Sequence, residues 1–277
     1  MAPRLLVITP TYNEADNLEG FLTALFRVMP DAHALVVDDA SPDGTGRLAD
    51  RLAGTDERVA VLHRSAKMGI GSAYLEGFRY GLRHGYDALV QMDTDLSHDP
   101  AHLPAMVEAM ESGADLVVGS RNVAGGGVRG WGPGRHVLSK GGSVYSRLVL
   151  GLGVRDLTSG YKLWRRSTLE AIDFAVIRSE GYSFQIEMTY RALRRGFRVV
   201  EVPILFFDRR AGQSKMSYGI FLEAVLLVWR LRLEATLARS TPHERDGGLR
   251  SPARPGPAAS PGSARSGARS GPRQGGR

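Results

Sequence analysis

Residues 88–98, Ala-Leu-Val-Gln-Met-Asp-Thr-Asp-Leu-Ser-His, join a short apolar run directly to a polar cluster. The run Ala88–Met92 has the length and composition of a buried strand, and Asp93 and Asp95 follow it at once. Paired carboxylates repel each other unless a cation relieves the repulsion. Hard divalent ions such as Mg²⁺ and Mn²⁺ prefer oxygen ligands of this kind. We therefore predict that Asp93 and Asp95 share a metal ion with a diphosphate group.

The residues after this pair also fit the start of a helix. Ser97 or Asp99 stands just before Pro100, and a capping side chain followed by proline is typical of a helix N-terminus. A helix cap and a metal site are compatible here. We expect His98 to make local hydrogen bonds near the metal loop, with a general-base role as the alternative.

Short runs rich in β-branched residues recur along the chain, each followed by turn residues and then by apolar residues at helical spacing. Besides Ala88–Met92, these runs are Leu5–Thr9, Ala34–Asp38, Val59–Leu62 and Leu116–Gly119. This alternation predicts an α/β fold with a mainly parallel sheet sandwiched by helices. We expect further helices near residues 135–150 and 183–195, and one more strand over Phe197–Phe206.

Polar residues gather where three of the predicted strands end. Thr11–Glu14, Asp38–Asp43 and Asp93–His98 lie at the carboxyl ends of strands, where open α/β sheets bind ligands. Carboxylates there can accept hydrogen bonds from a nucleobase and a ribose, and Tyr12 can pack against a base. Taken singly, the first two segments are also ordinary turn sequences. Lys67 is placed to meet groups of the same ligand.

Composition excludes several classes of protein. The chain has no cysteine, which rules out disulfides, thiolate zinc sites and cysteine nucleophiles. No Gly-x-Gly-x-x-Gly turn follows the first predicted strand and no Walker lysine motif occurs, which argues against dinucleotide oxidoreductases and P-loop enzymes.

The net charge of +7 is unevenly distributed. Residues 240–277 hold seven arginines against Glu244 and Asp246, so the body of the chain is nearly balanced and we expect no nucleic-acid partner. The first apolar stretch is too short for a signal peptide, and we expect a cytoplasmic location.

The chain changes character after residue 214. The apolar run Ile220–Trp229 is interrupted by Glu223 and followed by arginines. Ten helical residues cover about 15 Å, half of the roughly 30 Å needed to cross a membrane. We therefore predict an amphipathic helix over residues 215–239 that lies in a membrane interface, with packing against the protein core as the alternative. Residues 240–277, rich in Pro, Gly, Ser and Arg, are predicted to be disordered.

Two further segments carry predictions. Gly125–Gly134 is rich in glycine, contains Trp131 and shows little periodicity, so we expect a mobile loop that acts as a lid beside the site. Glu187 lies four residues before Arg191 on a predicted helix. A surface ion pair and an active-site role are both compatible with that spacing.

Eight short motifs occur in a fixed order over residues 4–218. They are Thr-Tyr-Asn-Glu (11–14), Asp-Asp-Ala-Ser-Pro-Asp-Gly-Thr (38–45), Met-Asp-Thr-Asp-Leu-Ser-His (92–98), Gly-Ser-Arg (119–121), Gly-Gly-Gly-Val-Arg-Gly-Trp (125–131), Thr-Ser-Gly-Tyr-Lys (158–162), Gly-Tyr-Ser-Phe-Gln-Ile-Glu-Met (181–188) and Asp-Arg-Arg-Ala-Gly-Gln-Ser-Lys-Met (208–216). In this order they resemble the dolichyl-phosphate or polyprenyl-phosphate mannosyltransferases of glycosyltransferase family 2, of the short type without a multi-span membrane domain. Met68 and Ile70 depart from the pattern, which has small or leucine-like neighbours around these glycines.

The resemblance implies the GT-A fold of nucleotide-diphospho-sugar transferases over residues 1–214. It implies that the donor contacts Pro10, Tyr12, Glu14, Val37, Asp39, Lys67, Asp93, Thr94 and Lys215. The metal ligands would be Asp93 and Asp95, and the catalytic residues Asp95, Arg121 and Arg209. The acceptor phosphate would contact Arg121, Arg135 and Ser139.

The implied reaction is an inverting transfer of mannose from GDP-mannose to a polyprenyl (dolichyl-type) monophosphate, with Mg²⁺ or Mn²⁺ as cofactor. A glucosyltransferase that uses UDP-glucose and a non-catalytic subunit that binds nucleotide sugar or lipid are the alternatives. We further expect a peripheral location on the cytoplasmic face of a membrane, with a membrane-protein partner. Because a phosphate monoester has a second pKa of about 6, the acceptor is anionic at neutral pH, and we expect no indispensable general base.

Overall fold

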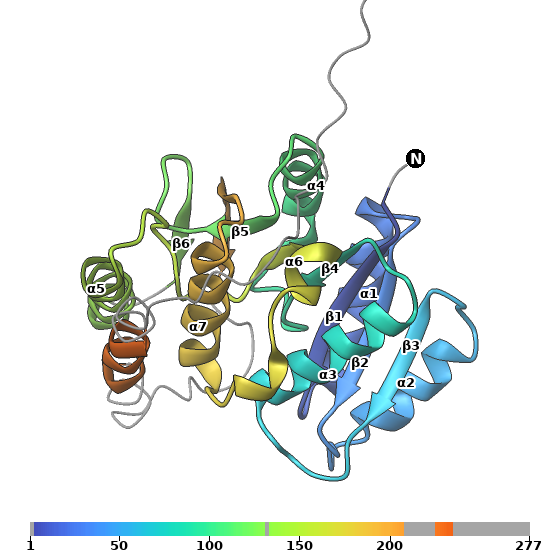
Figure 1. The fold of residues 1–277 in the computed structure, drawn as a ribbon. Helices are drawn as coiled ribbons and strands as arrows, with labels where there is room; N and C mark the ends of the chain where they lie inside the picture. Colours follow the sequence, from blue (N-terminus) through green and yellow to red (C-terminus); the bar gives the residue numbers. More distant parts are fainter. Residues whose placement is uncertain (1–2, 131–132, 208–224, 235–277) are drawn as a thin grey trace, which may run out of the picture. The chain divides into compact units, whose positions relative to one another are not determined.

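The computed structural model describes residues 3–130, 133–207 and 225–234, and for residues 133–139 only the helical backbone (Figure 1). A seven-stranded sheet with the order β3-β2-β1-β4-β7-β5-β8 forms the centre of the fold. Its strands are β1 (Leu5–Thr11), β2 (His33–Asp38), β3 (Val59–His63), β4 (Ala88–Gln91), β5 (Leu116–Ser120), β7 (Lys162–Arg165) and β8 (Val199–Pro203). A second sheet pairs β6 (Gly127–Arg129) with β9 (Leu205–Phe207).

The prediction of a mainly parallel sheet is confirmed. The five strands predicted from apolar runs are present, each within two residues of its predicted limits. The exception to parallel pairing is β7, which is antiparallel to both of its neighbours, β4 and β5. Its four residues follow a turn-rich segment and were too few to be recognised as a strand.

Helices cover both faces of the sheet (Figure 1). They are α1 (Ala15–Val28), α2 (Thr45–Ala53), α3 (Ile70–Arg83), α4 (Leu103–Glu111), α6 (Arg166–Glu170) and α7 (Gly181–Arg194), with 3₁₀ turns at Pro100–His102 and Phe174–Val176. A further helix, α5 (Pro133–Leu150), packs beside α7 in a separate buried cluster.

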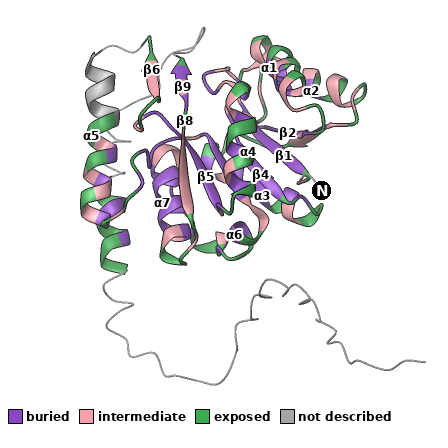
Figure 2. Cartoon of the chain, turned by 90° about the horizontal axis from the view of Figure 1, so that it is seen from above, coloured by how far each residue is buried: buried purple, intermediate pink, exposed green. Residues whose placement is uncertain are grey.

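Because successive strand residues point to opposite faces, the sheet has a core on each side. In β1, Val7 packs with α1, α2 and α4, whereas Leu6 and Ile8 pack with α3, α6 and α7. Figure 2 shows the result, with the central strands buried and the outer faces of the helices exposed. Burial on both faces explains why the strands are continuous apolar runs.

Two sequence predictions are wrong in detail. The single strand predicted over Phe197–Phe206 is two strands in different sheets, because β8 ends at Pro203, which has no N–H to continue a ladder. The loop predicted over Gly125–Gly134 contains β6 and the first residues of α5, and within the described residues β6 pairs with the distant β9. Trp131 lies outside the described residues, and the lid stays a prediction.

The helix over residues 225–234 packs on α5 and α7. Leu227 and Leu231 share a buried cluster with side chains of both helices, and the Tyr190 hydroxyl donates to the Leu231 carbonyl oxygen at 3.1 Å. Leu226 and Trp229 are exposed. One face of the predicted interfacial helix thus packs on the protein, as the alternative prediction had it. In the described ranges, no helix has the length and hydropathy that a membrane span requires.

Candidate active site

The polar clusters meet at one edge of the large sheet. β1, β2 and β4 run parallel, so the segments after Thr11, Asp38 and Gln91 leave the sheet on the same side. β7 reverses direction between β4 and β5, which brings the end of β5 at Ser120 to the same edge. The structure therefore places the turns that carry Tyr12, Asp39, Asp93 and Arg121 at one edge, where such sheets bind ligands.

The predicted metal ligands lie in a loop with fixed geometry. The Tyr74 hydroxyl donates to Oδ1 of Asp93 at 3.2 Å, and Oδ1 of Asp95 accepts from the backbone N–H of Ser97 at 3.0 Å. Burial and the neighbouring Asp93 carboxylate hold the pKa of Tyr74 well above its ordinary value. Tyr74 therefore stays protonated and orients Asp93 as a hydrogen-bond donor. Leu96 completes the tight turn with a φ of 58°.

This loop fits a cation that also binds a substrate. Among the described residues, no group of three or more His, Cys, Asp or Glu side chains could hold a metal alone. Mg²⁺ in particular binds through one or two carboxylates, several waters and substrate phosphates. Asp93 and Asp95 match that requirement. Within the described part of the chain the buried Ser97 hydroxyl has no hydrogen-bond partner, and it offers a further oxygen in the same loop.

His98 supports the loop that carries the predicted metal ligands Asp93 and Asp95. It is buried, and its Nδ1 accepts from the backbone N–H of Asp93 at 3.2 Å. Its ring packs against Tyr161 and Phe206, with centroids 5.2 and 5.5 Å apart. The prediction of local hydrogen bonding by His98 is thus confirmed, and the contact with Phe206 links the metal loop to β9.

The helix cap predicted next to the metal loop is also present. Asp99 accepts a hydrogen bond from the backbone N–H of Ala101 at 2.9 Å and caps the 3₁₀ turn that begins at Pro100.

Asp39, a predicted nucleotide contact, is buried and holds a neighbouring turn. Its Oδ2 accepts from the backbone N–H groups of Met68 and Gly69 at 3.1 and 3.2 Å. Arg64 donates from Nη1 to Oδ1 at 2.6 Å and to the Gly69 carbonyl oxygen at 3.1 Å. Asp39 therefore fixes the turn that carries Lys67, and Arg64 compensates its charge.

Lys67 and Tyr12, both predicted donor contacts, touch each other. The Lys67 ammonium lies 3.8 Å from the centroid of the Tyr12 ring, a cation–π arrangement. Lys67 thus lies on a ring that was predicted to pack against a base.

The remaining predicted donor residues that the structure describes lie at the same edge and differ in how far they are buried. Val37 is fully buried in the core, so its side chain cannot reach a ligand. Thr94 is buried and hydrogen-bonded to Thr9 at 2.7 Å, with Pro10 beside it. Glu14 is half-buried and accepts from the Asn17 side chain at 2.8 Å.

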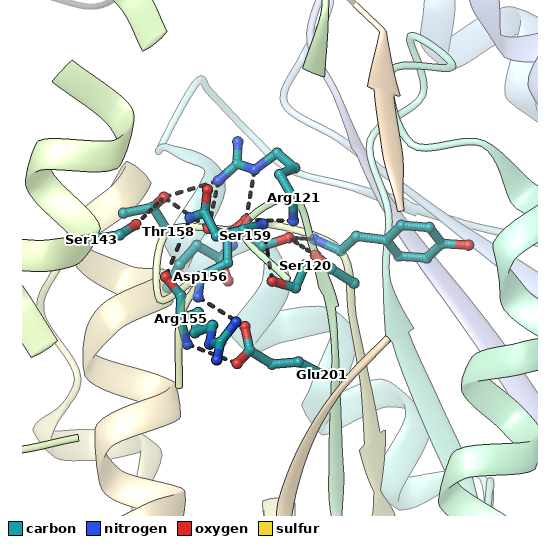
Figure 3. A network of polar contacts seen from close by, with 12 residues as sticks. Ser120, Arg121, Ser143, Arg155, Asp156, Thr158, Ser159 and Glu201 are labelled. Atoms are coloured by element: carbon teal, nitrogen blue, oxygen red, sulfur yellow. Dashed lines mark hydrogen bonds and ion pairs between the residues drawn. The ribbon is translucent and has the colours of Figure 1, made fainter. Parts of the chain in front are cut away.

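Arg121 follows the end of β5 and belongs to a buried ion pair (Figure 3). Asp156, which is 0% exposed, accepts from Nε and Nη2 of Arg121 at 2.7 Å each. The backbone N–H of Arg121 donates to the same carboxylate at 3.0 Å. Burial opposes the charge on Arg121, but the Asp156 carboxylate outweighs it and raises the pKa of Arg121. Burial alone would raise the pKa of Asp156, but the Arg121 guanidinium outweighs it, so the pKa of Asp156 is lowered.

Several predicted residues are described in part or not at all. Arg209 and Lys215 lie outside the described residues. Arg135 and Ser139 lie in α5, at positions where only the helical backbone is described. Their assignments stay predictions.

Glu187 is buried in α7, where it accepts hydrogen bonds from Ser179 and Arg191. The predicted pair with Arg191 therefore exists, but Glu187 is buried and not on the surface. Arg191 also lies 3.8 Å from Glu234 at the end of the helix over 225–234.

Sequence reasoning missed Arg64, Tyr74 and Asp156. Each acts through another polar residue of the site, and two of them carry a weak local signal. Arg64 directly follows β3, and Asp156 stands two residues before a recognised motif, but neither spacing shows which side chain it meets.

The chain is similar to known proteins in sequence and in fold. The model of the family "Glycosyl transferase family 2" matches residues 6–173. The polyprenol monophosphomannose synthase of Mycolicibacterium smegmatis is 52% identical over 239 residues, which are 85% of this chain and 90% of that protein. The undecaprenyl-phosphate mannosyltransferase of Micrococcus luteus is 52% identical over 232 residues, which are 84% of this chain and 95% of that protein.

Among solved structures, glucosyl-3-phosphoglycerate synthase from Mycobacterium tuberculosis, in complex with Mn²⁺, UDP-glucose and phosphoglyceric acid, superposes with a TM-score of 0.63. The match covers 83% of this chain and 80% of that one at 19% identity, which is a likeness of fold. Together with the family match and the two close relatives, this shows that the chain belongs to glycosyl transferase family 2 and is a glycosyltransferase with a GT-A fold.

Proposed function

We propose that the chain transfers mannose from GDP-mannose to a polyprenyl monophosphate with inversion at the sugar. The observation that carries this proposal is the meeting of the Asp93–Asp95 loop and Arg121 at one sheet edge, beside the turn that holds Lys67. Such an edge can hold a nucleotide diphosphate and a second phosphate at once. Two relatives at 52% identity, both named for mannose and a polyprenyl acceptor, support the choice of sugar and lipid.

Asp93 and Asp95 would hold the Mg²⁺ or Mn²⁺ ion. Bound there, the cation supplies positive charge against the charge that grows on the departing diphosphate. Tyr74 and His98 keep the loop in shape through their bonds to Asp93. Lys67, and Lys215 beyond the described residues, would add further positive charge on the donor side.

The acceptor phosphate would meet Arg121, Arg135, Ser139 and Arg209. Its own oxygen is the nucleophile, since a phosphate monoester loses its second proton at about pH 6. The buried carboxylate and imidazole that sequence reasoning considered both have structural partners. Glu187 is bonded to Ser179 and Arg191, and His98 is bonded to the Asp93 backbone. This supports a transfer without a protein base.

A lipid acceptor requires that the protein contact a membrane. The described structure has exposed apolar side chains that suit such a contact. Exposed apolar side chains lie on α5 (Val144, Leu148) and on the helix over 225–234 (Leu226, Trp229, Leu233). The two helices share a buried cluster and lie side by side (Figure 1). We propose that this apolar surface docks the protein peripherally on the cytoplasmic face of a membrane, directly or beside a membrane-protein partner.

The test is a donor panel with the purified full chain, Mg²⁺ and a short-chain prenyl phosphate. Radiolabelled GDP-mannose should give a labelled lipid, and the anomeric proton and carbon signals of the product should show inversion. A faster reaction with UDP-glucose would mean that UDP-glucose, and not GDP-mannose, is the donor. Absence of turnover with every nucleotide sugar, despite donor binding, would favour the non-catalytic subunit.

A further inference from the structure

The position of Arg121 depends on a hydrogen-bond network around Asp156 (Figure 3). This network joins the end of β5 to β8 and to α5. Asp156 engages one edge of the guanidinium, through Nε and Nη2, as well as the backbone of Arg121. A bidentate pair of this kind fixes the plane of the guanidinium as well as its location. Arg121 cannot change rotamer without breaking bonds to a fully buried carboxylate.

Asp156 is itself held from two sides. Glu201 of β8 accepts from the backbone N–H groups of Arg155 and Asp156 at 2.8 and 2.9 Å, which pins the turn that carries the carboxylate. The Thr158 hydroxyl accepts from Nη2 of Arg121 at 2.9 Å and donates to Oδ1 of Asp156 at 3.2 Å.

The network also reaches α5. Ser143 is hydrogen-bonded to Thr158 at 3.4 Å. Arg135 and Ser139 stand eight and four residues earlier on the same helix, and residues at such spacing share a helix face. Through Thr158, the Arg121–Asp156 pair is therefore connected to the helix that carries two further residues assigned to the acceptor phosphate.

Charge alone gives no reason for Asp156 to be there. Its carboxylate cancels the charge of Arg121 and so weakens the long-range attraction of the site for a phosphate. A paired arginine still presents N–H groups in fixed directions, which a mobile, unpaired cation does not. The pair therefore favours orientation over net charge.

We propose that Asp156 is a positioning residue of the transfer reaction. It holds the Arg121 guanidinium in the orientation that binds the acceptor phosphate, and Thr158 and Glu201 hold Asp156. This rests on the proposed function, in which Arg121 contacts that phosphate. Removing the Asp156 charge has two opposite consequences, a more positive site and a less ordered Arg121, and the loss of order dominates.

The test compares acceptor and donor kinetics of Asp156→Asn in the full chain, with GDP-mannose, Mg²⁺ and a short-chain prenyl phosphate. An asparagine NH₂ group would face the guanidinium donors and break the bidentate pair. We expect KM for the prenyl phosphate to rise about tenfold and kcat to fall, with KM for GDP-mannose within about twofold of wild type. In an Arg121→Gln background the same change should add nothing, because residues that act as a unit are not additive.

Stability needs its own control, since breaking a buried ion pair destabilises a fold. Thr158→Val and Glu201→Gln keep both charges of the pair and should shift the acceptor KM in the same direction by less. Glu170→Gln, which breaks an exposed pair with Arg166 on α6, should change neither KM. Thermal unfolding of each variant shows whether the assay temperature lies below its transition.

Three results would overturn the positioning role. They are a folded Asp156→Asn with a lower acceptor KM, an equal rise in both KM values, and the same effect with and without Arg121. Calorimetric titration with the prenyl phosphate makes the comparison without turnover, and positioning then requires weaker binding by Asp156→Asn. A wild-type protein that binds this lipid but transfers no mannose contradicts the proposed function, while the titration still decides the role of Asp156.

Discussion

The proposed donor half and the proposed acceptor half of the site are built in different ways. The donor half comprises the turns after β1, β2, β3 and β4, where buried carboxylates hold backbone N–H groups. Asp38 binds the Ser41 N–H at 3.1 Å, and Asp39 binds those of Met68 and Gly69. The acceptor half instead depends on one buried ion pair, between Arg121 and Asp156, that draws on β8 and α5.

This difference indicates how each half should respond to substitutions. In the proposed donor half, neighbouring turns are joined by single side chains, as Asp39 joins the turn after β2 to the turn after β3. A single substitution there should therefore disturb the contacts of one or two turns to the nucleotide sugar. In the acceptor half, one network orients the phosphate-binding groups together, so substitutions remote from the ligand should act alike.

The largest effect is expected at the metal loop. Asp95→Asn should lower kcat roughly a hundredfold to a thousandfold, because the cation contributes several kcal/mol to the transition state. Initial rates measured over a range of Mg²⁺ concentrations should also show weaker metal-dependent donor binding, as a higher Mg²⁺ concentration for the half-maximal rate. Asp99→Asn, which alters only the cap of the 3₁₀ turn in the same loop, is the matched control and should retain most activity. Unchanged Mg²⁺ dependence in Asp95→Asn would remove the metal assignment.

Arg64→Met should affect stability and donor binding together. It leaves the buried Asp39 carboxylate without its cation, which costs about 3 kcal/mol in the free energy of unfolding. The turn that carries Lys67 loses its support, so KM for GDP-mannose should rise while KM for the prenyl phosphate stays near wild type. Urea unfolding and initial-rate kinetics measure the two effects. An equal change in both KM values would mean that the halves are not separate.

Lys67→Met should show whether Lys67 contacts the diphosphate or the base of the donor. Lys67 lies on the Tyr12 ring and so competes with a base for that surface, but its charge favours the diphosphate. By calorimetry, GDP should bind about tenfold more weakly to the variant, since one charged contact is worth about 1.5 kcal/mol. Guanosine, which has no phosphate, should bind equally well or better. Weaker binding of guanosine would instead make Lys67 a contact of the base.

The smallest effect on chemistry is expected at the apolar surface. A variant with both Leu226→Asp and Trp229→Asp should lose affinity for liposomes, whereas its activity on a short, soluble prenyl phosphate should be unchanged. Leu227 is left intact because it packs in the core beside α5 and α7. Undiminished liposome binding, measured by sedimentation, would place the membrane contact elsewhere.

The meeting of the turns in the proposed donor half could be predicted because the residues involved follow strands directly in the sequence. Asp93 and Asp95 directly follow a strand, and the carboxyl ends of parallel strands meet without further information. The exception is Val37, whose side chain is buried because strand residues alternate between the two faces. Lys67 was predicted as a donor contact, and the structure places it on the Tyr12 ring, but Arg64, which holds its turn, was not found.

The acceptor half was harder because its partners are distant in sequence. Arg121 and Asp156 are 35 positions apart, and Glu201 follows after another 45. β7 and β6 have four and three residues, too short to show a period, and they exist through pairing with remote strands. Packing of the helix over 225–234 likewise depends on contacts that its own apolar pattern does not specify.

The claim that ties the two halves together is that the acceptor phosphate brings its own nucleophilic oxygen and needs no base from the protein. The most direct test is the pH dependence of kcat/KM for the prenyl phosphate in wild type, His98→Gln and Glu187→Gln, each checked for folding. The account predicts one common ionisation, at about pH 6, below which the rate falls as the acceptor takes up a proton. If Glu187→Gln or His98→Gln abolished turnover while folding, donor binding and acceptor binding stayed intact, a protein base would be required and the account would be wrong.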